Sequence, residues 1–254
     1  MLEIVLKFFH FFTAVHYFYA IYYDCVYVLP EEIKLREYSF GGKFVYLTVL
    51  NVVGSSNTRD LKMMRRINFC HPQALQGIFF TIAFVNDFIG SNEAVPKKIP
   101  VIRKIKDYLF AAFAFPLALD VTLKFWSLYA IDRNLVFPEV LDEFFPSWLN
   151  HVLHSNITIL IMVEMIVVHR LYPTRKAGVC GLMTFMLSYF VWMLITRYYA
   201  GKWTYPILDI LDTYGRIGFF AGALCFPVLL YFLGEYLNKK IWTEKRILRA
   251  NSLN

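Results

Sequence analysis

Cysteine and histidine are both scarce in this sequence. Its 254 residues include four cysteines and six histidines. The cysteines are scattered and show neither a disulfide framework nor the paired spacing of a zinc site. The histidines are too few for a membrane di-iron centre, in which many of them cluster. We therefore expect no metal and no other cofactor.

Charge is also low. Charged residues make up 18% of the chain, hydrophobic residues 58% and aromatic residues 19%, and the mean hydropathy is +0.47. This composition is typical of a membrane protein. The net charge of +7 does not indicate nucleic acid, because the basic residues lie in short loops and in the tail. No cleavable signal is evident, since the first apolar run is long and lacks a small-residue cleavage site.

The hydrophobic pattern predicts an all-α, polytopic membrane protein with about six transmembrane helices in one bundle, forming a single domain over residues 1–254. The second span is interrupted by a polar, basic stretch that is expensive to place in lipid. Without residues 52–72 the flanking runs would form one span of ordinary length, so we interpret 52–72 as an insertion. The expected spans are residues 5–29, 43–51 plus 74–90, 107–131, 146–168, 178–200 and 217–237.

The basic residues predict the orientation. With six spans, thirteen lysines and arginines fall on the side that holds both termini, and seven fall on the other side, leaving out Lys7, Lys124 and the insertion. The positive-inside rule then places both termini in the cytosol. The endoplasmic reticulum and the plasma membrane are not distinguished.

The fourth span carries an unusual number of polar groups in its first half. Asn150 and His154 are four residues apart, and so are His151 and Ser155, which places them on two adjacent stripes of a helix. Polar groups at membrane depth indicate either a functional site or hydrogen bonding between helices. Spacing alone favours neither interpretation.

Thr48 and His154 fall at one depth in this topology, roughly 9–12 Å below the non-cytosolic surface. Threonine needs a neighbouring base to act as a nucleophile, and a neutral histidine can accept its proton. Asn150 could orient the imidazole ring. The set would suit acyl transfer on a lipid ester. A metal site built from His151, His154 and a third ligand is less favoured, because Glu164 lies about 15 Å further along the helix.

Two other polar features are expected to have structural roles only. His10 and His16 are six residues apart and thus on different faces of the first span, so we take them as interfacial or packing residues. Asp120 and Lys124 are at i,i+4 and are expected to form a salt bridge inside the bundle.

Several strings, none specific alone, recur together in order and with matching spacing. They include 129–133 (YAIDR), 148–154 (WLNHVLH), 169–175 (HRLYPTR), 201–206 (GKWTYP), 233–238 (LGEYLN) with 241–242 (IW), and 41–42 (GG) with 44–48 (FVYLT). With them the chain resembles the family of the androgen-induced protein and the androgen-dependent TFPI-regulating protein. The resemblance covers nearly the whole chain except residues 52–72.

The resemblance implies a six-span membrane hydrolase that cleaves fatty acid esters of hydroxy fatty acids. The family's threonine nucleophile falls on Thr48 and its catalytic histidine on His154, while Asn150 and His151 would be supporting residues. The partners it implies are the lipid substrate and the bilayer, with no nucleic acid.

The sequence departs from the family in two places. The insertion begins four residues after Thr48 and endangers the helix that would position it, and Asp120 and Lys124 stand where relatives are largely apolar. The alternative to an active hydrolase is therefore a non-enzymatic membrane regulator or scaffold of the same family, inactivated by the insertion.

Overall fold

A computed structural model describes residues 2–28, 72–93, 96–137, 139–143, 145–200, 203, 205 and 207–251. Every regular element within these ranges is helical, which confirms the prediction of an all-α protein. Thr48, the expected half-span 43–51 and residues 52–71 of the expected insertion lie outside the described residues.

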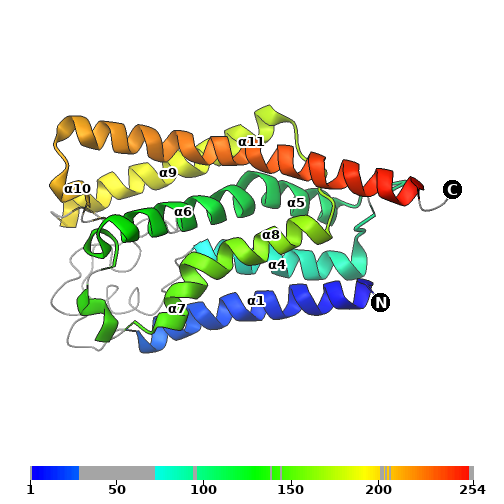
Figure 1. Ribbon diagram of the computed structural model, residues 1–254, viewed down its shortest axis with the longest axis horizontal. Helices are drawn as coiled ribbons and strands as arrows, with labels where there is room; N and C mark the ends of the chain where they lie inside the picture. Colours follow the sequence, from blue (N-terminus) through cyan, green and yellow to red (C-terminus); the bar gives the residue numbers. More distant parts are fainter. Residues whose placement is uncertain are drawn as a thin grey trace, which may run out of the picture.

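The long helical segments alternate in direction along one bundle axis, with α5 and α6 forming one segment and α7 and α8 another (Figure 1). The first helix begins and the last helix ends at the same end of the bundle (Figure 1). Two π-helical turns, η2 (Phe110–Ala114) and η5 (Val152–Asn156), join consecutive helices, and η3 (Arg133–Leu135), η4 (Glu139–Glu143) and α10 (Ile207–Ile210) lie in connections. The helices of the bundle are α1 (Leu2–Tyr27), α4 (Pro72–Ile89), α5 (Val101–Leu109), α6 (Phe115–Ile131), α7 (Ser147–His151), α8 (Ile157–Val167), α9 (Arg175–Ala200) and α11 (Thr213–Asn251).

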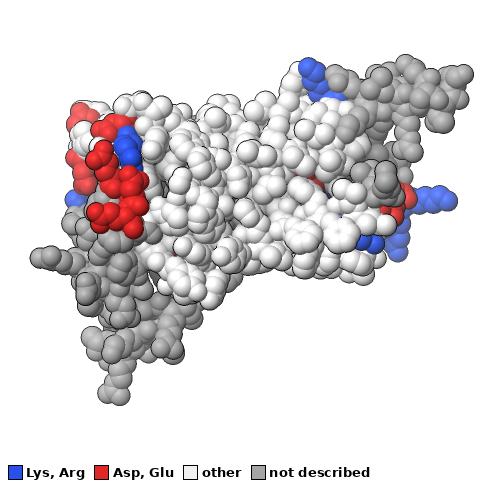
Figure 2. All heavy atoms as spheres, turned by 60° about the horizontal axis from the view of Figure 1, so that its bottom comes forward, with Lys and Arg blue, Asp and Glu red and all other residues white. Residues whose placement is uncertain are grey.

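The outer surface of the bundle is apolar along most of its length. On the face shown in Figure 2, charged side chains gather at the two ends and leave the middle free of charge. Helix α1 exposes 59% of Phe8 and 61% of Phe12 while burying His10 and Thr13, the reverse of a helix in water. Five helical segments are long and apolar enough to cross a membrane, namely Glu3–Asp24, Val101–Ile131, Ser147–Val167, Arg175–Tyr199 and Thr213–Thr243, and Gln73–Ile89 is a shorter apolar helix. The protein is therefore a helical membrane bundle.

The helical segment formed by α5, η2 and α6 is interrupted at the π-helical turn η2, where neighbouring helices pack closely. Pro116 has no backbone N–H to donate one turn back, and the π-helical turn η2 ends just before it. Ala111, Ala112 and Ala114 of this turn are fully buried, and small residues let membrane helices approach closely. The amide of Gln76 on α4 donates to the Ala114 carbonyl at 2.8 Å.

The salt bridge expected on α6 is confirmed. The Lys124 ammonium lies 2.6 Å from one carboxylate oxygen of Asp120 and 2.9 Å from the other. Asp120 is 3% exposed, and Lys124 also reaches the Ala223 carbonyl of α11 at 3.5 Å. The pair therefore joins α6 to α11, and its charges satisfy each other within the apolar bundle.

Candidate functional site

His154 lies in a π-helical turn. Helix α7 ends at His151, the wider turn η5 follows, and α8 begins at Ile157. Such turns are rare and are found mostly as single-turn bulges, frequently at functional sites. They also leave backbone groups without their ordinary α-helical partners. The turn places a half-buried imidazole near the end of the bundle opposite to the chain termini.

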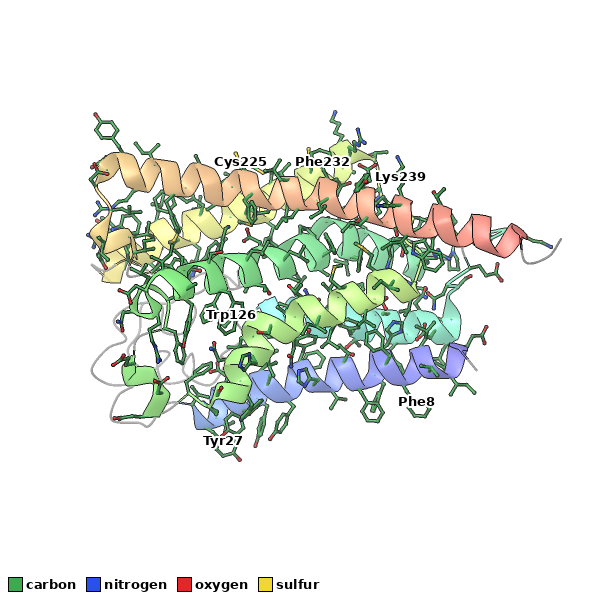
Figure 3. All side chains as sticks on the ribbon, in the orientation of Figure 1. Phe8, Tyr27, Trp126, Cys225, Phe232 and Lys239 are labelled. Carbon is green, nitrogen blue, oxygen red and sulfur yellow. The ribbon has the colours of Figure 1, made fainter. Side chains whose placement is uncertain are left out.

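Helix α6 fixes the turn from one side. The rings of Phe125 and His154 are stacked with centroids 3.6 Å apart and planes 3° apart. The Trp126 indole N–H donates to the His154 carbonyl at 3.0 Å and to the Ser155 hydroxyl at 3.2 Å, and Figure 3 labels Trp126 between the two helices. One residue of α6 thus restrains the imidazole ring, and the next restrains the backbone that carries it.

The other polar residues of this segment lie around the same turn. The ring nitrogen Nδ1 of His151 lies 3.2 Å from the Ser155 hydroxyl, as their spacing predicted, and the His151 ring stacks on Trp126 with a centroid distance of 5.6 Å. Asn150 is 8% exposed, and its side-chain oxygen has no hydrogen-bond partner among the described residues. His151 is therefore a surface residue held by Ser155 and Trp126, and Asn150 presents a buried acceptor.

The first turn of α4 reaches the same place. The amide of Gln73 is 1% exposed and donates to the Leu153 carbonyl at 3.1 Å. Leu153 immediately precedes His154, so α4 begins against the turn that carries the candidate base. Thr48, the candidate nucleophile, lies outside the described residues.

A second polar cluster fills the bundle toward the end that holds the chain termini. His10 is fully buried, and its two ring nitrogens lie 2.6 Å from an Asp87 carboxylate oxygen and 2.9 Å from a Glu164 oxygen. A neutral imidazole has a single N–H, so the two contacts require an imidazolium or a protonated carboxyl group. The interpretation of His10 as an interfacial or packing residue is wrong, because it joins α1, α4 and α8 through charged groups.

Two buried arginines complete this cluster. Arg170 binds Glu164 and lies 3.2 Å from an Asp107 carboxylate oxygen, and Arg103 approaches the other oxygen of Asp107 at 3.3 Å. Burial lowers the pKa of the Arg170 guanidinium and Asp107 opposes the shift, yet arginine stays protonated in proteins. The buried carboxylates therefore act as its counter-charges, and Asn238 bonds to both backbone groups of Arg170.

The sequence contained a signal for this cluster that spacing arguments missed. His10, Asp87 and Glu164 each stand within a strongly apolar run, where an isolated charge is costly and a partner is needed. Arg103, Lys106 and Arg170 are among the thirteen basic residues that the sequence assigns to the side with both termini, but all three are at most 1% exposed. Within the described ranges, no group of three His, Cys, Asp or Glu residues could hold a metal ion.

Comparison with known proteins gives a consistent result. The sequence model of the FAR-17a/AIG1-like protein family matches residues 5–239. The androgen-dependent TFPI-regulating protein of Mus musculus is 34% identical over 236 residues, covering 91% of this chain and 93% of that protein. The androgen-induced gene 1 protein of Homo sapiens is 29% identical over 214 residues, covering 82% and 81%. No solved structure matches. The chain belongs to the FAR-17a/AIG1-like family.

Proposed function

We propose that this protein is an integral membrane hydrolase that cleaves fatty acid esters of hydroxy fatty acids, with Thr48 as nucleophile and His154 as general base. The Thr48 hydroxyl attacks the ester carbonyl while His154 takes its proton. His154 then protonates the departing hydroxy fatty acid. Water, deprotonated by the same imidazole, attacks the acyl-threonine, and the imidazolium returns the proton to the Thr48 oxygen as the fatty acid leaves.

The observation that carries the proposal is the restraint on His154. A general base must hold its ring within hydrogen-bond reach of the proton that it removes, and Phe125 and Trp126 together fix both the ring and its backbone. The Phe125 ring gives the imidazole an apolar neighbour, as a site for a lipid requires.

The position of Gln73 supports the pairing with Thr48. If residues 52–72 were absent, Asn51 would directly precede Gln73, and Thr48 would lie four residues before Gln73. Residues four apart lie on the same face of a helix, and Gln73 faces the turn that carries His154. An uninterrupted helix would thus direct Thr48 toward His154.

The depth of the turn fits the proposed substrate class. The ester of such a lipid lies among acyl chains, so a site within the membrane can reach the scissile bond. The chain also belongs to the FAR-17a/AIG1-like family, and the sequence resemblance to that family implies this substrate class.

The test is covalent labelling with a fluorophosphonate probe of serine and threonine hydrolases. It compares the full chain, a form lacking residues 52–72, and Thr48→Ala in each. We expect labelling that Thr48→Ala removes, at least in the form without the insertion. Labelling of that form alone would mean that the insertion silences the enzyme. If both folded forms stay unlabelled, or if Thr48→Ala labels as strongly as its parent, the proposal is wrong.

Trp126 provides a test of the restraint on His154. Trp126→Phe keeps an aromatic ring but removes the N–H that bonds the His154 carbonyl and the Ser155 hydroxyl. We expect kcat for ester hydrolysis to fall about 10- to 100-fold, because small misplacements of a catalytic group are costly, with KM little changed. The control is Trp148→Phe, whose ring packs on Tyr23. Equal kcat values for the two variants would contradict the restraint.

A non-enzymatic regulator or scaffold remains the second candidate, and one contact favours it. The Thr158 hydroxyl lies 3.1 Å from the Ala118 carbonyl and 2.8 Å from the Thr122 hydroxyl, which is hydrogen bonding between membrane helices. If the whole polar segment served this purpose, variants of His154 would lower the amount of folded protein instead of its turnover.

We also propose that both termini face the cytosol. Exposed lysines at the end where the chain begins and ends include Lys97, Lys98, Lys239 and Lys240. The exposed residues Asp132, Asp142, Glu143 and Asp212 lie in the connections at the other end, between α6 and α7 and before α11. This asymmetry agrees with the positive-inside rule. His154 would then lie in the non-cytosolic half of the membrane.

A further inference from the structure

Helix α5 buries its charged side chains and exposes its apolar ones. Its buried face carries Arg103, Lys106 and Asp107, each at most 1% exposed, whereas Val101 is 72% exposed and Ile105 is 45% exposed. A helix at a water interface would have the opposite arrangement. The outer face of α5 therefore meets an apolar environment, and the bilayer is the one that a membrane bundle provides.

A cavity of about 440 Å³ opens beside this outer face. Its volume lies in the range of roughly 300–1,000 Å³ found for small-molecule sites. Most of the wall is apolar and comes from α5, the segment before it and the connection between α8 and α9. The lining residues are Ile99, Lys104, Ile105, Asp107, Tyr108, Leu109, Leu171 and Pro173.

The polar groups of the wall differ in how they are engaged. Asp107 accepts hydrogen bonds from Arg103, Arg170 and the Leu171 backbone N–H, so its charge is balanced within the bundle. The Tyr108 hydroxyl donates to the Ala177 carbonyl at 3.3 Å. Lys104 is exposed and forms no ion pair with any residue in the described ranges. The lining of the cavity thus combines a mostly apolar wall with the positive charge of Lys104, which no described carboxylate neutralises.

We propose that this cavity binds an acidic phospholipid of the surrounding leaflet, with one acyl chain against the apolar wall and the anionic headgroup on Lys104. Lys97 and Lys98 are exposed just before Ile99 and add positive charge on the same segment. A lysine near a membrane surface attracts acidic lipids. Membrane phospholipids can also reach a cavity beside the apolar outer face of α5 without leaving the bilayer. The site is separate from the His154 turn, which lies toward the other end of the bundle, and does not depend on the proposed hydrolase activity.

The test is native mass spectrometry of the purified full chain with phosphatidylserine, with phosphatidylcholine of the same acyl chains, and with oleate. We expect one tightly retained phosphatidylserine. Lys104→Gln should weaken its binding about fivefold and leave phosphatidylcholine unaffected. Lys239→Gln makes the same charge change at an exposed position of α11 away from the cavity lining and should bind as the parent does.

A second variant tests the apolar wall. Ile105→Trp places a larger side chain at the mouth of the cavity and should weaken the binding of both phospholipids. Equal phosphatidylserine affinities in Lys104→Gln and the parent would overturn the proposal, as would no preference for phosphatidylserine over phosphatidylcholine. Retention of oleate in place of phospholipid would also overturn it, because the site would then be one for free fatty acids.

Discussion

His154→Ala should lower the hydrolysis of a fatty acid ester of a hydroxy fatty acid at least about a hundredfold, while the protein stays folded in the membrane. General acid–base catalysis contributes typically about 10²–10⁴-fold, and His154→Ala removes the proposed base. The measurement is single-turnover release of the fatty acid by purified protein, in the form with the insertion and in the form without it.

His151→Ala is the matched control for this result. His151 is exposed, lies one turn before His154 and has its own hydroxyl partner in Ser155. We expect a loss of at most about tenfold, since an outlying polar group contributes less than the base itself. Equal losses in the two histidine variants, or full activity in His154→Ala with Thr48 intact, would remove His154 from the mechanism.

Arg170→Ala should destabilise the bundle by about 3–5 kcal/mol, because it removes a counter-charge from two buried carboxylates. Removing one partner of a buried ion pair leaves an uncompensated charge, and this cost exceeds what the pair contributed. Here Glu164 and Asp107 would both lose the Arg170 guanidinium. Among the described residues, only His10 and Arg103 would still form ion pairs with them. The guanidinium also lies over the Phe110 ring at 4.5 Å, so packing is lost as well. The measurement is the denaturant midpoint of unfolding in mixed micelles.

Arg175→Ala gives the comparison at an exposed site. The Arg175 side chain is 66% exposed and pairs with Glu235 at 2.9 Å, and an exposed pair contributes less than about 1 kcal/mol. Arg170→Lys separates charge from geometry, because lysine keeps the charge but cannot reproduce the two-pronged contact. It should recover only part of the loss. A midpoint for Arg170→Ala equal to that of Arg175→Ala would mean that the cluster is hydrated.

The two polar clusters have different physical roles. The cluster of His10, Glu164 and Arg170 pairs opposite charges within the bundle, and such internal satisfaction is what a structural site needs. The turn that carries His154 has a buried acceptor on Asn150 and holds its imidazole by stacking and by backbone contacts. The charged cluster therefore fits a structural role, and the turn fits the catalytic role proposed for His154.

Local pattern was sufficient for several features. Apolar runs of bilayer length predict the helical bundle, because a backbone in lipid must satisfy its own hydrogen bonds. The pairs Asp120 with Lys124 and His151 with Ser155 follow from a spacing of four residues, since helix geometry alone brings such positions together. The concentration of polar residues around His154 is likewise visible in the sequence.

Other features depended on which helices pack together. His10 lies 77 residues from Asp87 and 154 residues from Glu164, and no periodicity links positions so far apart. The π-helical turn at His154 and the contact from Gln73 also depend on α4 and α6 packing against that segment. Helix α5 shows the same limit, because its charged face turns inward only where Asp107 can meet Arg170. The sequence by itself determined the class of protein and the position of its polar segments along the chain, and tertiary packing decided which charges meet, because a charge inside a membrane is stable only where a partner from another helix lies beside it.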